Sequence, residues 1–265
     1  MISYQPAPSV LVGLAALAGL YGLCVGRYRD RFVGATPPSR WQVLSFASGI
    51  VVLLIALASP LDTLADTYLF TAHMLQHLLL VLGAAPLLLG GTPGWLLRDL
   101  LQATHLSGFA RRARHPLIAY FGFNLVFSLA HLPSLYELAL RSEPLHALEH
   151  LIFLGAAVVM WLPILSPLQA VVPRYPPLGQ VLYLFLQTVP ASLVGALLSA
   201  TASPYYPTYI QAPRITALSP IEDQQLGGLL MWVGSGIYFL IATGVVFFAW
   251  ASREEAANRR PLGAH

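Results

Sequence analysis

The sequence has few charged residues, one cysteine and no lysine. Only 9% of its 265 residues are charged, whereas 57% are hydrophobic, and the mean hydropathy is +0.68. A soluble domain carries roughly 25% charged residues, so a water-soluble fold is excluded. All 14 basic residues are arginines and the net charge is only +3. No basic groove with interleaved aromatic residues is visible, so we expect no nucleic-acid partner.

The scarcity of cysteine and the missing catalytic motifs exclude several kinds of chemistry. With Cys24 alone, the chain can form neither an intrachain disulfide nor a CxxC redox or zinc motif. No GxSxG or HExxH motif occurs, and no pair of carboxylates lies deep in an apolar stretch. We therefore expect a protein that is not an enzyme and that binds any metal through ligands other than thiolates.

Seven apolar stretches are long enough to cross a bilayer, which takes about 20 residues. They cover approximately residues 9–26, 41–59, 68–89, 116–132, 146–165, 178–198 and 226–250. No repeat is visible, and the loops are too short to fold alone. These features predict an all-α fold, a polytopic membrane protein whose seven transmembrane helices form one domain over residues 1–265.

The arginines predict the orientation of this bundle, because short Arg-rich loops stay in the cytoplasm. One side holds Arg27, Arg29, Arg31, Arg40, Arg98, Arg111, Arg112, Arg114, Arg174, Arg253, Arg259 and Arg260. The opposite loops hold only Arg141 and Arg214, together with most of the acidic loop residues. We therefore predict that the N-terminus lies outside and the C-terminus in the cytoplasm.

Five of the eight histidines then fall at one depth, near the outer ends of three helices. Two pairs have i, i+4 spacing, which places both rings on one helix face. These five residues are His73, His77, His131, His146 and His150. Imidazole suits copper, zinc, iron and nickel, and histidines without cysteine on the oxidising side favour copper. The pattern predicts a metal site, although a single HxxxH pair would also fit hydrogen bonding between helices.

Three further residues have two interpretations each. Glu149 can orient a ligand histidine, or it can be a carboxylate satisfied by backbone amides at a helix start. Asp223 can cap the last helix or line the site. Met231 lies near the expected depth, where it can be a soft copper ligand or a packing residue.

Several sequence blocks together resemble the CtaG-type family of cytochrome c oxidase assembly factors. The blocks are HMLQH at 73–77, APLLLG at 85–90, HLP at 131–133, YE at 136–137, LH at 145–146, EH at 149–150, DQQLGG at 223–228 and MW at 231–232. The resemblance extends over nearly the whole chain. It implies a seven-helix protein of the bacterial plasma (inner) membrane that helps deliver copper to a haem–copper oxidase. The family's motif histidines fall on the five listed above, and its acidic motif falls on Asp223.

Our first hypothesis is therefore a copper-binding assembly factor with its metal site at the extracytoplasmic side of the lipid bilayer. The expected partners are an oxidase subunit that bears a copper centre and a periplasmic copper chaperone, and an oligomer is compatible with the sequence. A second hypothesis is a haem b electron-transfer protein with axial histidines from two helices. A third is a copper transporter, although charged or thiol ligands are missing from the inner half of the predicted helices.

Overall fold

The computed structural model describes residues 7–113 and 115–259, and every regular element within these ranges is helical. This confirms the predicted all-α class. Arg114 and Arg260, which entered the orientation argument, lie outside the described residues. The orientation itself remains a prediction, because the structure contains no membrane.

Six helical stretches in the described ranges are long and apolar enough to cross a membrane. They are Pro8–Val25 (α1), Arg40–Leu57 (α2), Phe70–Gly91, Glu143–Leu165 (α10), Pro177–Ala200 (α11) and Pro220–Ala257. The third consists of α4 (Phe70–Leu78), a π-helical turn (Leu79–Ala84) and α5 (Ala85–Gly91). The last consists of α13 (Pro220–Leu229), a π-helical turn (Leu230–Gly234) and α14 (Ser235–Asn258).

The stretch predicted at 116–132 is a bent pair of helices. α8 (Pro116–Ala130) is followed by α9 (Pro133–Leu140), and the two are inclined by 72°. Leu132 is extended, with ψ of 127°, because proline disfavours helical backbone in the residue before it. The chain thus has six spans, or seven when the bent pair is one span.

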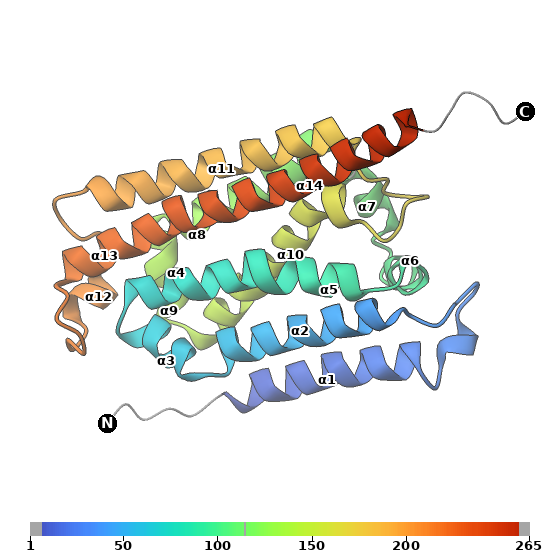
Figure 1. Ribbon diagram of the computed structural model, residues 1–265. Helices are drawn as coiled ribbons and strands as arrows, with labels where there is room; N and C mark the ends of the chain where they lie inside the picture. Colours follow the sequence, from blue (N-terminus) through green and yellow to red (C-terminus); the bar gives the residue numbers. More distant parts are fainter. Residues whose placement is uncertain (1–6, 114, 260–265) are drawn as a thin grey trace, which may run out of the picture.

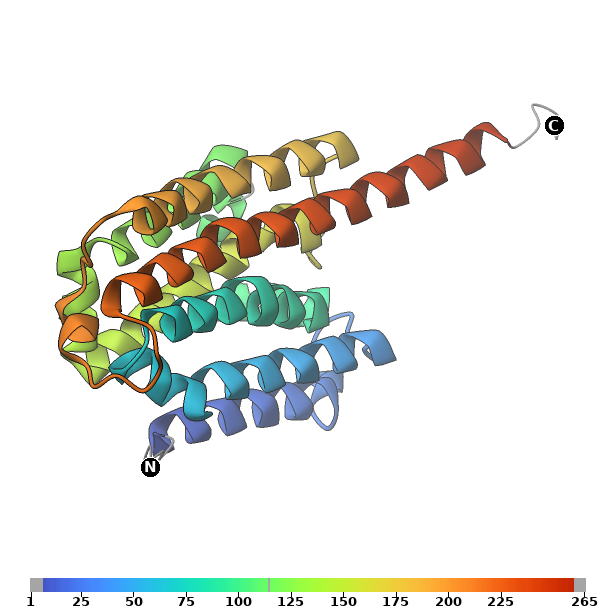
Figure 2. The ribbon, with the colours of Figure 1, turned by 60° about the vertical axis from the view of Figure 1, so that its left-hand side comes forward.

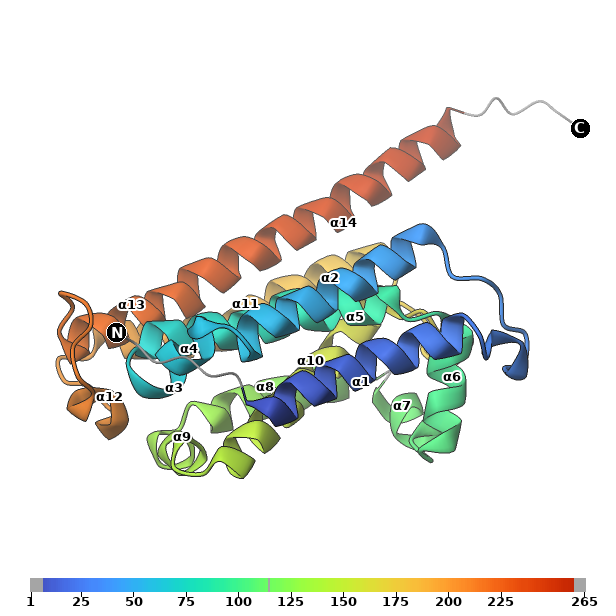
Figure 3. The same cartoon turned by 90° about the horizontal axis from the view of Figure 1, so that it is seen from below.

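The last helix is longer at both ends than the predicted 226–250. Ser219 accepts a hydrogen bond from the backbone amide of Glu222, whose side chain bonds back to Ser219, so a capping box starts the helix before the apolar stretch. At the other end α14 continues to Asn258 and extends beyond the rest of the bundle (Figures 2 and 3). Hydropathy locates the membrane core of such a helix and misses its polar ends.

Short helices gather at the two ends of the bundle (Figure 1). At one end lie α3 (Pro60–Thr67), α9, α12 (Pro207–Gln211) and the start of α1. At the other end lie α6 (Gly94–Ala103), α7 (Ser107–Ala113) and the finish of α14, and a short 3-10 turn spans Arg29–Arg31. The described chain therefore starts and finishes at opposite ends, as an odd number of crossings requires.

The helical stretch Phe70–Gly91 is the centre of the bundle. Within its most apolar 18 residues, 56% of the residues are buried, compared with 11% in α1. α5 packs on α2 and α10, while α4 packs on α3 and α13. On the far side, α11 packs on α13 and α14. Side chains of α4 are therefore surrounded by neighbouring helices on several sides.

Glycines let the last two spans approach closely. A Cβ atom added at Gly195 of α11 would lie 2.6 Å from the carbonyl oxygen of Gly228 on α13. A Cβ atom at Gly228 would lie 2.6 Å from Oγ of Ser199. Small residues at such crossings allow backbone contact between membrane helices. These glycines therefore let α11 and α13 pack backbone to backbone.

Candidate metal centre

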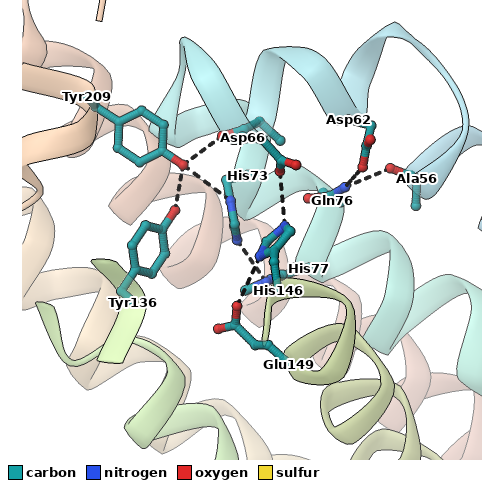
Figure 4. Close-up of polar contacts among 11 residues, drawn as sticks. Ala56, Asp62, Asp66, His73, Gln76, His77, Tyr136, His146, Glu149 and Tyr209 are labelled. Carbon is teal, nitrogen blue, oxygen red and sulfur yellow. Dashed lines mark hydrogen bonds and ion pairs between the residues drawn. The ribbon is translucent and has the colours of Figure 1, made fainter. Parts of the chain in front are cut away.

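Two of the predicted histidines form the middle of the site. His73 and His77 lie one turn apart on α4 and are 0% and 3% exposed. Their Nε2 atoms are 2.9 Å apart (Figure 4), so one ring donates a proton to the other. Two nitrogens bound to one ion at about 2.0 Å each lie roughly 3 Å apart or slightly more. A metal ion can therefore replace the shared proton with little movement of the rings.

The other three predicted histidines surround this pair. The ring centroid of His146 lies 5.3 Å from that of His73, and those of His150 and His131 lie 5.5 Å and 5.8 Å from that of His77. All five rings are buried. α4, α10 and the bend between α8 and α9 thus bring the five histidines into one cluster, which we call the histidine cluster.

Part of the histidine cluster has the geometry of a metal site. One nitrogen from each of His73, His146 and His150 lies within 4.8 Å of the other two, and the same holds for His73, His77 and a carboxylate oxygen of Glu149. Three buried ring nitrogens have no hydrogen-bond partner among residues 7–113 and 115–259: Nδ1 of His77, Nε2 of His131 and Nε2 of His150. Burying such atoms without a partner is costly. The cluster can therefore hold a metal ion, and the donors are imidazoles.

The protonation state of His73 follows from its partners. Tyr209 on α12 donates its hydroxyl proton to the carbonyl oxygen of Ala65 at 2.7 Å, and its oxygen lies 3.2 Å from Nδ1 of His73. Because Tyr209 has one proton, Nδ1 of His73 must be the donor to the tyrosine oxygen. Nε2 of a neutral His73 then carries a lone pair that faces the cluster. Tyr136 on α9 bonds the same hydroxyl at 2.8 Å.

Two carboxylates hold His146. Its Nε2 lies 3.0 Å from Asp66 on α3, and its Nδ1 lies 3.3 Å from Glu149 on α10 (Figure 4). Glu149 occupies the position expected of a carboxylate that orients a histidine. Because both ring nitrogens are engaged, an ion bound to His146 must displace one carboxylate while the other keeps the ring in place.

Sequence reasoning missed Asp66, Tyr136 and Tyr209 as parts of the site. Asp66 was noted only as an acidic loop residue, and Tyr136 only as part of a block shared with a family. All three lie on short helices at the end of the bundle, whose position depends on tertiary packing. The sequence offered one signal that could have found them, which is that all three are polar residues in the predicted loops at the same end of the bundle as the histidines.

The side chain of Asp223 binds the first turn of a neighbouring helix, α4. Its carboxylate accepts hydrogen bonds from the backbone amides of Phe70 at 2.7 Å and Thr71 at 3.1 Å, and its side chain is fully buried. The hydroxyl of Thr71 donates to the carbonyl oxygen of Asp223 at 2.8 Å. Asp223 therefore caps the first turn of α4, the helix that carries His73 and His77, and Ser219 caps its own helix.

Met231 lies beneath the histidine cluster. It is 2% exposed and lines a cavity of about 30 Å³ together with Met74, His77 and His131, space for one water molecule. Asn124 also lines this cavity and donates to the side chain of Gln187 at 2.9 Å. Met231 thus lines the same cavity as two histidines of the cluster, His77 and His131.

An acidic cleft leads to the histidine cluster from the outside of the bundle. It has a volume of about 430 Å³ and lies between α1, α2, α3 and α10. Its polar lining residues are Ser9, Asp62, Asp66, Glu143, His146 and His150. Three carboxylates at the entrance to a group of imidazoles attract cations. We call it the acidic cleft.

Burial raises the pKa of Asp62 from its ordinary value of 3.8 to about 6, and the charge of Asp66 adds to this effect. Because the folded protein retains a proton that the unfolded chain loses, its stability should fall as pH rises from about 4 through 6. Asp62→Asn should remove this slope in thermal unfolding of the detergent-solubilised protein. Asp30→Asn, at an exposed carboxylate, should leave the slope intact, and an unchanged slope in Asp62→Asn would contradict the assignment.

Residues 19–253 match the family described as cytochrome c oxidase caa3 assembly factor, Caa3_CtaG. The chain belongs to this family. The resemblance noted in the sequence is thereby confirmed. Comparisons with curated proteins and with solved structures found no match.

The match covers the whole of the site in this caa3 assembly factor. The five histidines of the cluster and Asp66, Glu149, Asp223 and Met231 all lie within the matched residues. Tyr136 and Tyr209 do as well. The buried cluster therefore lies within the segment that matches the family.

Proposed function

We propose that this protein is a membrane-embedded copper-binding assembly factor that helps deliver copper to a cytochrome c oxidase during its maturation. The observation that carries the proposal is the approach of His73, His146 and His150, whose ring nitrogens lie within 4.8 Å of one another in a buried site. Copper is the cargo of the site. The protein provides ligands and a place of transfer, so it is not an enzyme.

The donor set supports copper. Imidazole suits copper as well as zinc, iron and nickel, and among these metals copper fits a family whose members are assembly factors of caa3 cytochrome c oxidase. Cys24 lies near the finish of α1, at the end of the bundle opposite the histidine cluster (Figure 1). Met231 lines the same small cavity as His77 and His131, and a thioether is a soft donor that copper accepts.

The surroundings support release by ligand exchange. His146 binds two carboxylates, so it can return to Asp66 or Glu149 when copper leaves. The acidic cleft gives a cation a route to His146 and His150. In the predicted orientation, this end faces the extracytoplasmic side of the bacterial plasma membrane. There a periplasmic copper chaperone would supply the ion and an oxidase subunit with a copper centre would accept it.

The geometry favours copper over the haem hypothesis. The haem hypothesis requires axial histidines from two helices, one on each face of the porphyrin. The cavity between His77 on α4 and His131 after α8 has a volume of only about 30 Å³, far too small for a porphyrin ring. An absorption spectrum of the purified protein tests this directly. A Soret band would support haem, and a spectrum without one agrees with copper. Uptake of copper into vesicles that contain the protein would instead support the transporter hypothesis.

The test of delivery is the copper content of the oxidase made in cells. In cells whose only copy of the factor is His73→Leu/His150→Leu, we expect purified caa3 oxidase to keep its haem and to lose most of its copper. Two of the three ligands of the compact imidazole group are then removed, and only His146 remains. The control is His105→Asn, in a loop at the opposite end, where asparagine tolerates the positive φ of 57°. An oxidase with full copper content in the double variant would refute the proposal.

A further inference from the structure

The end of the bundle opposite the histidine cluster contains a basic pocket. Arg111 and Arg112 on α7, His115, and Arg174 in the connection between α10 and α11 line a pocket of about 590 Å³, together with Ile118 and residues 173, 175 and 176. None of the described residues that line it is acidic. Within the described ranges, none of these three arginines forms an ion pair with a carboxylate. Their positive charges are therefore uncompensated.

Arg174 is held in position at this pocket. Its Nε donates to the carbonyl oxygen of Ser166 at 3.1 Å, and its Nη2 donates to that of Leu165 at 3.4 Å. These backbone oxygens orient the guanidinium without neutralising it. An arginine anchored in this way presents its remaining donors to an anion with little loss of side-chain entropy.

An apolar groove adjoins the basic pocket. It has a volume of about 490 Å³, lies between α6, α7, α8 and α10, and shares Ile118 with the basic pocket. All of its lining residues are hydrophobic or glycine. Along α8 it extends from Ile118 to Val126, about 12 Å at the rise of a helix. Cβ atoms added at Gly122 or Gly155 would meet nothing within 4 Å, so the groove is open at both glycines.

We propose that the basic pocket and the apolar groove form one binding site for an anionic diacyl phospholipid. The phosphate binds Arg111, Arg112 and Arg174, and one acyl chain lies in the groove between α8 and α10. Phosphate is the chemistry that arginine groups recognise, and basic pockets next to membrane helices bind anionic headgroups. A transmembrane helix of a partner would fill the groove but would leave the three arginines without a counter-charge.

The first test uses the full-length protein in detergent and native mass spectrometry. The probes are phosphatidylglycerol, phosphatidylcholine with identical chains, and inorganic phosphate. We expect phosphatidylglycerol to bind more tightly than phosphatidylcholine. Arg111→Gln/Arg112→Gln/Arg174→Gln should weaken it by roughly 100-fold, since each arginine near an anionic group contributes about fivefold.

The control variant removes the same charge elsewhere: Arg27→Gln/Arg29→Gln/Arg31→Gln, three arginines that follow α1. It should keep the preference for phosphatidylglycerol. Equal binding of the two lipids by the unaltered protein would overturn the proposal, as would an equal loss in both triple variants. Inorganic phosphate that displaces the lipid at micromolar concentration would assign the pocket to a soluble phosphate ligand and would also overturn it.

A second test distinguishes lipid from protein in the groove. A photo-crosslinking amino acid at Gly155, where there is open space, should give an adduct of phospholipid mass after illumination of membranes. An adduct with a polypeptide would show that a partner helix occupies the groove and would overturn the proposal. Neither test depends on copper, and the triple variant of the basic pocket should retain its copper content.

Discussion

Asp223→Ala is expected to destabilise the folded protein by about 2–5 kcal/mol, since each buried donor left without a partner costs about 1–3 kcal/mol. The carboxylate accepts hydrogen bonds from the amides of Phe70 and Thr71 at the first turn of α4. Alanine leaves both amides without an acceptor, in a region where the replaced side chain was fully buried. Thermal unfolding of the detergent-solubilised protein measures the loss.

The neighbouring Glu222→Ala is the matched control. Glu222 belongs to an exposed capping box with Ser219, and losing part of such a cap costs about 0.5–2 kcal/mol. The two residues are adjacent and both acidic, so overall charge changes equally. An Asp223→Ala protein no less stable than Glu222→Ala would show that the contact with α4 contributes little.

His73→Leu/His77→Leu is expected to lower the copper content of the purified protein from about one ion per chain to less than about a tenth of that value. His73 belongs to both groups of residues whose ligand atoms converge, so its loss removes both. Leucine fills a similar volume and has no polar atom to bury, which favours folding of the variant. Metal analysis of the detergent-purified protein, alongside its thermal unfolding, gives the result.

Three companion variants make this experiment decisive. His105→Asn should keep full copper content, because His105 is exposed at the opposite end. Met231→Leu should change the content little, because the imidazoles suffice to hold the ion. His73→Gln, a single change at the residue common to both ligand groups, replaces the double variant should that protein fail to fold, and it should also lose copper. Full copper in a folded His73→Leu/His77→Leu protein would rule out the histidine cluster as the site.

The sequence was sufficient to predict the histidine cluster because its residues lie on long apolar helices. The i, i+4 spacing fixes which rings share a face, as for His73 and His77, and the alternating direction of the helices fixes their common depth. For Glu149 the sequence left two interpretations open, and its 3.3 Å contact with Nδ1 of His146 agrees with the one in which it orients a histidine. Each of these inferences uses only the regular geometry of a helix and the number of crossings.

The remaining parts of the site depend on how separate segments pack. Asp66 and Tyr209 come from α3 and α12, short helices whose position beside α4 no local pattern specifies. Asp223 was expected to cap its own helix or to line the site, yet it caps α4 through Phe70 and Thr71, which lie 153 and 152 residues away in the sequence. Pro133 marks the bend after α8, but the 72° angle results from packing. Tertiary contacts of this kind leave no periodic signal.

X-ray absorption spectroscopy at the copper edge of the copper-loaded protein tests the central claim most directly. We expect a first shell of nitrogen at about 2.0 Å with the outer-shell pattern of imidazole, and its loss in His73→Leu/His77→Leu. A first shell dominated by sulfur at about 2.3 Å, or an imidazole pattern that persists unchanged in the double variant, would contradict the account.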